Sequence, residues 1–319
     1  MTQFKPLFFC ILICFIGVFA IGINAQHNHT SILVITTFDY PGAGNSTTPF
    51  GINERGDIVG DYVDSAGVRR GFRRRIDGSF TTIVPPGTTG VPPGQTGTFT
   101  RAHGINNPRT IVGDFFNGPT NAFHGYFLNG TTFSQYDIGV IGGPFSTEIF
   151  GINDDGNFVG IFGSSVQHNR GYVNIGGTAA IVTIPAAFDS EADAINKSNR
   201  VVGTYRDAGL LDHGFIRSSN GTLTNPVDFP GAHTTLLRGI NSQGSIVGRY
   251  TDASGHEHGL FRKNANTYVS FDYPNSFGTS LNGINDFGFI VGRYTDAAGI
   301  RHGFVAWVRG GGDDDDDDD

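Results

Sequence analysis

The sequence is poor in cysteine and in helical patterning, and both shortages narrow the fold. Its 319 residues include two cysteines, Cys10 and Cys14, and both lie in the first fourteen positions. The rest of the chain therefore has no thiol, disulfide or cysteine metal site, and its stability must come from packing. After the N-terminus, no segment places apolar residues at helical spacing over the ten or more residues that a helix needs. These two absences favour an all-β fold without covalent cross-links.

Outside the C-terminus the chain also has little net charge of either sign. The formal charge is -8, but seven acidic residues form the terminal run Asp313–Asp319. Without that run and Lys5, 20 basic residues face 22 acidic ones. A nearly neutral body gives no support to a nucleic-acid partner. Residues 310–319 predict a disordered Gly and poly-Asp tail, because like charges in series cannot pack.

Motifs for known chemistry are missing. No Gly-x-Ser-x-Gly, His-Glu-x-x-His or phosphate-binding loop occurs, so nucleophilic, zinc-protease and nucleotide chemistry have no motif. The run Asn153–Asn157 superficially resembles a calcium loop, but it lacks the alternating oxygen ligands and the closing Glu. We therefore assign no catalytic residue, no metal site and no cofactor. Some enzymes, however, assemble their sites from scattered residues, so an enzyme stays open as an alternative.

The N-terminal segment indicates export. Met1–Ala25 has Lys5 near its start, an apolar run from Leu7 to Ile23, and Ala25 before Gln26. This pattern is typical of a secretory signal peptide cleaved after Ala25, and an uncleaved membrane anchor is the alternative. We expect a secreted or cell-surface protein with no membrane attachment after cleavage.

The rest of the chain is a repeat, best seen in Leu281–Phe304. Each copy has Gly-Ile-Asn, a turn, Val-Gly with an aromatic residue two positions on, and a His/Arg-Gly-aromatic triplet. The repeated asparagines lie 53, 47, 43, 45 and 44 residues apart: Asn53, Asn106, Asn153, Asn196, Asn241 and Asn285. The fifth copy predicts strands at Thr234–Ile240, Ser245–Thr251, His256–Arg262 and Tyr268–Tyr273. Four antiparallel strands with a period in the forties predict a β-propeller, and a β-solenoid ranks second.

The two ends of the repeat array predict a closed ring. Residues 31–43 resemble the fourth strand of later copies, whereas the sixth copy stops after its third strand at Val308. An N-terminal strand that completes the last blade removes the exposed sheet edges. We predict a six-bladed, four-stranded propeller over residues 26–309, closed by residues 31–43. Its blades are predicted at residues 48–94, 99–143, 146–187, 190–232, 234–276 and 279–309.

Four recurring elements together resemble one family. Gly-Ile-Asn, Ile-Val-Gly-x-Tyr, His-Gly-Phe and Asp-x-Pro-Gly-Ala are similar to the HAF-type extracellular repeats of bacterial secreted proteins. The resemblance covers about Thr37 to Val308 and implies export and a propeller-like domain. It implies no activity, because it carries over no catalytic residues.

Two further clusters have structural interpretations. The triplet histidines would lie in different blades and so could not share a metal; we expect each to pair with a turn Asp, as Asp252 with His258 and Asp296 with His302. Five arginines between Arg69 and Arg75 predict a solvated strand and turn, with an anionic polysaccharide site as the alternative. The insertion Pro85–Gly97 predicts a surface loop.

One position varies where a shared fold would allow uniformity. Just before the recurring Gly or Ala of the first strand, the copies carry different residues, while the position before that is mainly apolar. The varied residues are Phe50, His103, Phe150, Asp193, Arg238 and Asn282. Brought together near one axis, they predict a site for a small polar ligand, and the alternative is that they merely line a wet channel.

The function favoured by these patterns is a monomeric, secreted binding or scaffold propeller. Its expected partner is an unknown extracellular ligand, either a glycan or a small polar molecule. The alternatives are a carbohydrate-active or lactone-type enzyme with its site at the channel mouth, and a self-assembling surface protein. Paired acids near the axis would favour the enzyme, and exposed aromatic residues on one rim would favour binding.

Overall fold

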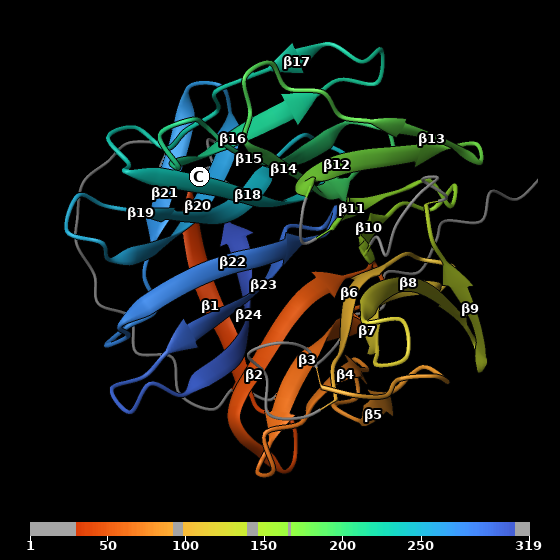
Figure 1. The fold of residues 1–319 in the computed structure, drawn as a ribbon. Helices are drawn as coiled ribbons and strands as arrows, with labels where there is room; N and C mark the ends of the chain where they lie inside the picture. The colour runs from red at the N-terminus through yellow and green to blue at the C-terminus, as the bar shows by residue number, and fades with distance from the viewer. Residues whose placement is uncertain (1–29, 92–97, 139–145, 165–166, 310–319) are drawn as a thin grey trace, which may run out of the picture.

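The computed structural model describes residues 30–91, 98–138, 146–164 and 167–309. These residues form 24 β-strands, arranged as six four-stranded antiparallel blades that we number 1 to 6 (Figure 1). No helix long and apolar enough to cross a membrane occurs among the described residues. The predicted signal peptide, both cysteines, the end of the Pro/Gly insertion and the acidic tail lie outside them.

The first three blades follow one another along the chain. Blade 1 contains β2 (Ala43–Ile52), β3 (Ile58–Asp64), β4 (Arg69–Arg74) and β5 (Phe80–Ile83). Blade 2 contains β6 (Thr100–Ile105), β7 (Ile111–Asn117), β8 (Ala122–Asn129) and β9 (Thr132–Tyr136). Blade 3 contains β10 (Ser146–Ile152), β11 (Phe158–Ser164), β12 (Gln167–Ile175) and β13 (Thr178–Ile181).

The last three blades repeat this order. Blade 4 contains β14 (Asp189–Ile195), β15 (Val201–Arg206), β16 (Asp212–Arg217) and β17 (Leu223–Thr224). Blade 5 contains β18 (Thr234–Ile240), β19 (Ile246–Thr251), β20 (Glu257–Asn264) and β21 (Thr267–Phe271). Blade 6 contains β22 (Gly278–Ile284), β23 (Phe289–Thr295), β24 (Arg301–Arg309) and β1 (Ser31–Phe38).

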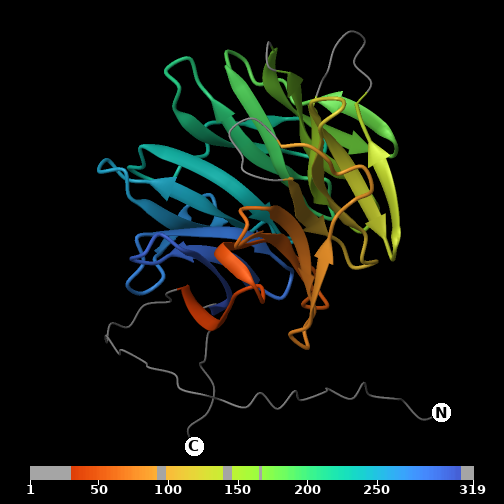
Figure 2. The same ribbon diagram turned by 60° about the horizontal axis from the view of Figure 1, so that its bottom comes forward.

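The closing strand is the one that the sequence predicts. β1 pairs antiparallel with β24 from Ser31 opposite Arg309 to Phe38 opposite Gly303. Figure 2 shows the red first strand beside the dark blue strands of the last blade. The N-terminal segment therefore completes the C-terminal blade, and the prediction of a closed six-bladed ring is confirmed.

The fifth copy shows where sequence and structure differ in detail. β18 has the predicted bounds, and β19 begins one residue later than predicted. β21 ends at Phe271, whereas the pattern predicts a strand to Tyr273. The difference arises because Tyr273 leaves its own blade and stacks on Tyr294 of the next blade, with ring centroids 3.7 Å apart.

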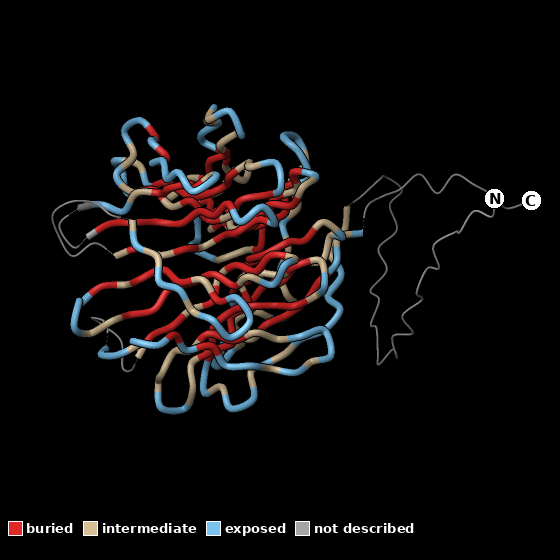
Figure 3. The backbone as a smooth tube through the Cα atoms, turned by 90° about the vertical axis from the view of Figure 1, so that its right-hand side faces the viewer, coloured by how far each residue is buried: buried red, intermediate tan, exposed pale blue. Residues whose placement is uncertain are grey.

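The hydrophobic core lies between the blades rather than within one layer. The buried apolar side chains of the described residues form six clusters, and each cluster joins two successive blades. One of them joins Val291 and Val305 of blade 6 to Ile58 and Phe72 of blade 1. Figure 3 shows these buried segments as red tubes inside exposed blue turns. In the second strand of every blade, the Val of the repeated Val-Gly is fully buried: Val59, Val112, Val159, Val202, Val247 and Val291.

Two glycine positions of the repeat are required by close approach. A Cβ on Gly160, in the Val-Gly of β11, would overlap the backbone carbonyl oxygen of Glu148 in β10. A Cβ on Gly283 of β22 would overlap the carbonyl oxygen of Phe50 in the neighbouring blade 1. No side chain has room at either place, which explains why residues 160 and 283 are Gly.

The Asp-aromatic-Pro motif after an outer strand joins that blade to the next one. Tyr40 stacks on Tyr62 with ring centroids 3.7 Å apart, and Phe229 stacks on Tyr250 at 3.9 Å. The backbone N–H of Tyr40 also donates to Thr47 Oγ1 at 3.0 Å. Such a stack stabilises the interface by roughly 0.5–1.5 kcal/mol in addition to the burial of its rings. The motif is therefore an inter-blade contact and not only a turn.

The triplet histidines have a closer partner than the sequence predicts. Nδ1 of His258 lies 2.9 Å from Asp272, whereas its Nε2 lies 3.5 Å from Asp252. His302 likewise lies 2.8 Å from Asp39 and 3.3 Å from Asp296. The turn Asp is thus the second partner, and the Asp of the Asp-aromatic-Pro motif is the first. The correction follows from the closing of each blade, which brings its outer strand next to the triplet.

The arginine cluster of blade 1 is largely compensated within the protein. Arg69 donates to both carboxylate oxygens of Asp61 at 2.7 Å, and Arg73 donates to Asp57 at 2.8 Å. The guanidinium of Arg74 lies over the ring of Phe38, 5.0 Å from its centroid. These contacts favour the structural interpretation over an anionic polysaccharide site.

Candidate functional site

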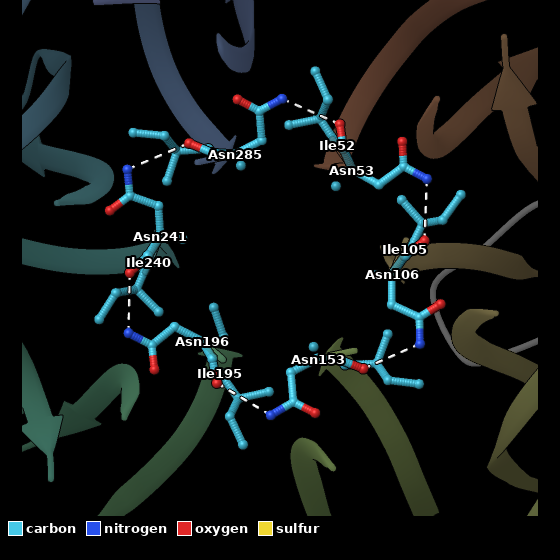
Figure 4. Close-up of a pocket in the computed structure, with 18 of the residues that line it drawn as sticks. Ile52, Asn53, Ile105, Asn106, Asn153, Ile195, Asn196, Ile240, Asn241 and Asn285 are labelled. Carbon is cyan, nitrogen blue, oxygen red and sulfur yellow. Dashed lines mark hydrogen bonds between the residues drawn. The ribbon is translucent and has the colours of Figure 1, made fainter. Parts of the chain in front are cut away.

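Six identical side chains form a closed hydrogen-bonded ring, the collar, around the propeller axis (Figure 4). The side-chain amide of each repeated Asn donates to the backbone carbonyl of the next one, over 3.0–3.3 Å. The last bond runs from Asn285 to Asn53 and joins blade 6 to blade 1. The sequence predicts a turn role, which Asn53 also has, because its Oδ1 accepts the N–H of Arg55 at 3.0 Å. The ring across blades is the part that sequence reasoning missed.

The residue after each collar Asn adds a partial second ring on the same side of the channel. The backbone N–H of Asn107 donates to Asp154 at 2.8 Å, and that of Asp286 donates to Glu54 at 2.9 Å. Desolvation raises the pKa of Glu54, and the nearby carboxylates Asp286 and Asp154 raise it further. This part of the channel encloses about 140 Å³.

The six predicted ligand residues are the bulged residues of the innermost strands. In every blade the pairing register between the first two strands shifts at this position, so the residue is skipped in the ladder. A β-bulge re-aims a side chain, and here it turns six side chains toward the axis. The residues of this bulge ring are Phe50, His103, Phe150, Asp193, Arg238 and Asn282. The structure therefore brings all six together around one channel, and the flanking apolar residues, such as Leu237 and Leu281, are fully buried.

The bulge ring divides into an aromatic half and a polar half. The His103 ring lies between Phe50 and Phe150, with centroids 4.8 Å away on each side. Across the channel, Arg238 donates to Asp193 Oδ1 at 2.5 Å. Asn282 donates to the carbonyl oxygen of Pro49 at 2.8 Å.

A second space, which we call the charged chamber, lies on the other side of the bulge ring and has a volume of about 380 Å³. Its walls add residues from two further positions of the repeat. One is two residues before the bulge in the first strand, and the other directly follows the Gly of the second strand. The charged residues so contributed are Arg101, Glu148, Glu191, Arg249 and Arg293.

One wall of the charged chamber is built around Arg101. This side chain donates to Asp114 at 3.1 Å and to Glu148 at 2.5 Å. His103 Nε2 lies 2.8 Å from the same Asp114. Desolvation raises the pKa of Glu148 to about 8 although Arg101 opposes it, whereas desolvation lowers the pKa of His103. Burial of this wall therefore disfavours the charged forms of both Glu148 and His103.

Asp193, which lines the same space, has one buried oxygen without a partner. Its side chain is 4% exposed, and Oδ1 is held by Arg238. Oδ2 is buried and accepts no hydrogen bond within the described part of the chain. Desolvation raises the pKa of Asp193 to about 7, Arg238 opposes the rise, and Glu191 adds to it. An unsatisfied buried polar atom costs free energy, so its presence in a folded protein calls for an explanation.

The opposite wall carries excess positive charge. Arg249 Nη1 donates to Glu257 at 2.6 Å, and Arg293 Nη2 lies 2.9 Å from the other oxygen of that carboxylate. Desolvation lowers the pKa of Arg249, and Arg238 lowers it further. Desolvation lowers the pKa of Arg293 to about 10, Glu257 opposes the fall, and Arg249 adds to it. One carboxylate thus serves two arginines that repel each other.

The charged chamber was missed by the sequence reasoning, although the signal was present. The residue after the Val-Gly of the second strand differs between copies in the same way as the bulge residue. The six copies carry Asp61, Asp114, Ile161, Thr204, Arg249 and Arg293 there. Comparison of the copies at every inward position, rather than at one, would have found both walls.

Candidate metal ligands are few among the described residues. No group of three or more His, Cys, Asp or Glu side chains able to hold a metal occurs within the described ranges. In the calcium-like run, Asn153 Oδ1 accepts the N–H groups of Asp155 and Asn157. Asp154 accepts both a backbone and a side-chain bond from Asn107 at 2.8 Å. These oxygens are engaged in the turn and in the next blade.

Comparisons with known proteins agree on the fold. No family model matches the chain, and no curated protein matches its sequence. A fungal lectin from Aleuria aurantia, described as a six-bladed β-propeller with a novel fucose recognition mode, is similar with a TM-score of 0.51 and 12% identity over 87% of this chain and 98% of the lectin. A mutant of AofleA from Arthrobotrys oligospora has a TM-score of 0.52 and 11% identity over 87% and 86%. A putative TolB from Agrobacterium tumefaciens has 0.53 and 11% over 89% and 99%.

At these identities the comparisons show a six-bladed β-propeller and leave the function open.

Proposed function

We propose that this chain is a secreted or cell-surface binding protein that holds a small polar ligand between the bulge ring and the charged chamber. The observation that carries the proposal is Asp193: its side chain lines a cavity of about 380 Å³, and its Oδ2 is buried without a partner among the described residues. Cavities of this size with a few convergent polar groups are typical small-molecule sites. The HAF-type assignment and export belong to the same proposal and rest on the repeated motifs and on Met1–Ala25.

The similarity to fucose lectins adds weak support for a glycan as the ligand. One structure of the Aleuria aurantia lectin is in complex with a fucose-containing disaccharide. Glycans and small polar metabolites are therefore the first compounds to screen against the mature domain.

The test combines such a screen with near-isosteric variants of the polar half of the bulge ring. Asp193→Asn and Arg238→Gln should each weaken the ligand found by roughly tenfold or more, because a charge-assisted hydrogen bond contributes about 1.5–3 kcal/mol. Asp77→Asn, on an exposed turn of blade 1, is the matched control and should leave affinity unchanged. Full affinity in both channel variants would place the ligand elsewhere.

A second candidate function is a carbohydrate-active enzyme. The observation that favours it is the pair of acids with raised pKa in one chamber, Glu148 at about 8 and Asp193 at about 7, since a general acid must hold a proton near neutral pH. Incubation of bound glycans with the protein, followed by product analysis, separates the two functions. Cleavage that Glu148→Gln abolishes would replace binding by catalysis.

A further inference from the structure

We propose that the ligand of the charged chamber is a carbohydrate that carries a carboxylate, of the hexuronate class, with the carboxylate held by Arg249 and Arg293. This inference rests on the proposed binding function and names the class of ligand. It is carried by the arrangement of charge, aromatic surface and hydrogen-bonding groups around one cavity.

The position of the carboxylate follows from the arginines. Three guanidinium groups, those of Arg238, Arg249 and Arg293, line the same cavity and come from adjacent blades. Arg238 is paired with Asp193, while Arg249 and Arg293 share the single carboxylate of Glu257. Arg249 uses Nη1 and Arg293 uses Nη2 in these contacts, so further N–H groups of both forks are available to an anion. A carboxylate matches that geometry, because guanidinium binds it through two parallel hydrogen bonds.

The mutual repulsion of these arginines supports an anion at this place. The pKa of Arg249 is lowered partly by Arg238, and that of Arg293 partly by Arg249. Desolvation is the larger cause of both shifts, and Glu257 is the one carboxylate that the guanidinium groups of Arg249 and Arg293 share. A bound carboxylate would relieve this repulsion, whereas a neutral ligand would leave it in place.

The rest of the ligand follows from the other walls. Phe50 and Phe150 are half-buried and present aromatic surface on the channel side opposite Arg238. The carboxyl groups of Glu148 and Asp193 belong to residues that line the cavity between these rings and the arginines. A pyranose ring has an apolar face and several hydroxyl groups at its edge, so it meets both requirements. The volume of about 380 Å³ is at the lower end of the range of ligand sites and suits one sugar residue.

The experiment measures binding of galacturonate and glucuronate to the mature protein by calorimetry, with galactose and glucose as neutral counterparts of the same size. The uronates should bind at least about tenfold more tightly than the hexoses, because the missing carboxylate removes a charge-assisted contact. A short oligogalacturonide tests whether the same group at the end of an acidic polysaccharide is accepted.

Variants then locate the contact. Arg249→Gln and Arg293→Gln should each weaken uronate binding by about tenfold or more and leave hexose binding unchanged. Each single variant leaves Glu257 with one arginine, so the fold should be retained. Arg75→Gln is the control: it also removes one positive charge, but Arg75 lies on an exposed turn of blade 1 and does not line the charged chamber. It should leave uronate binding unchanged.

The outcomes separate this inference from the proposed function. Equal binding of uronates and hexoses, or unchanged uronate affinity in both arginine variants, overturns the ligand class. If a neutral compound binds and loses affinity in Asp193→Asn, the binding function stands and the uronate class falls. If no compound depends on the channel residues, both fall.

Discussion

The collar and the bulge ring surround the same channel from the same six strands, only three residues apart, yet they obey opposite rules. The collar uses Asn in all six blades, and each amide bonds the next blade. The bulge ring uses aromatic, basic, acidic and amide side chains in turn. A fold with sixfold repetition needs the same contact six times, which explains the first ring. It does not need five different side-chain types at that one position, so the second ring points to a ligand without sixfold symmetry.

The largest expected effect comes from breaking the repetition itself. Deletion of residues 26–44 removes β1 and Tyr40, which pair with β24 and stack on Tyr62. The edge of β24 would be exposed and the interface between blades 6 and 1 would lose its aromatic contacts. We expect aggregation or loss of cooperative unfolding in a thermal scan followed by light scattering.

Ile35→Thr is the control for that deletion, because Ile35 is 48% exposed on the same strand. It should unfold like the parent protein. A truncated protein that stays monomeric and melts cooperatively at an unchanged temperature would contradict the role of the closing strand.

The fold could be predicted down to its closing strand because the sequence motifs that specify it are local and recur in six copies. The period, the Val-Gly pairs and the orphan strand at residues 31–43 each state one requirement of a closed ring. Contacts between side chains that lie far apart in the chain were harder to predict from the sequence. The contacts of Asn285 with Asn53 and of His302 with Asp39, for example, each span more than 230 residues. No local pattern encodes the partner of such a contact, and only ring closure brings the two residues together.

Of the candidate site, the bulge ring could be predicted from the repeats, but the charged chamber as a whole could not. Comparison of the copies found the bulge ring, because variation at one strand position stands out against the repeat. It did not show that Arg249 and Glu148, on different strands of different blades, would line one chamber. Which side chains meet across a channel depends on blade number and strand tilt, and neither can be read from a single copy.

A substitution to the same residue in the two rings sharpens the comparison. Asn53→Leu removes the donor to Asn106 at 3.0 Å and leaves the N–H groups of Arg55 and Asp57 without their acceptor. Because Asn53 is buried, we expect a loss of roughly 2–4 kcal/mol in the free energy of unfolding. Phe50→Leu should cost less than about 1.5 kcal/mol, since it replaces one apolar side chain by another.

Urea unfolding of both variants provides the measurement. Equal losses would mean that the bulge ring is as structural as the collar, and the argument for a ligand from its variation would fail.

The smallest expected effect concerns the histidines that fasten the outer strands, and it depends on pH. Burial lowers the pKa of His213 and His302, but Asp228 and Asp39 respectively outweigh it, so both pKa values lie above 6.5. A raised folded-state pKa stabilises the protein fully below pH 6.5, and this contribution is lost as the pH rises through the higher folded value. Both pairs are partly exposed to solvent, so each contributes only about 0.5 kcal/mol. The raised pKa values of Asp193 and Glu148 act in the same direction, so the free energy of unfolding of the parent protein should fall between pH 6 and pH 9.

His302→Gln should show a smaller fall in the free energy of unfolding than the parent. His256→Gln, whose side chain is 74% exposed, is the control and should show the same fall as the parent. An identical fall in all three proteins would show that these His–Asp pairs do not stabilise the ring, and that backbone pairing and the aromatic stacks hold the outer strands without them.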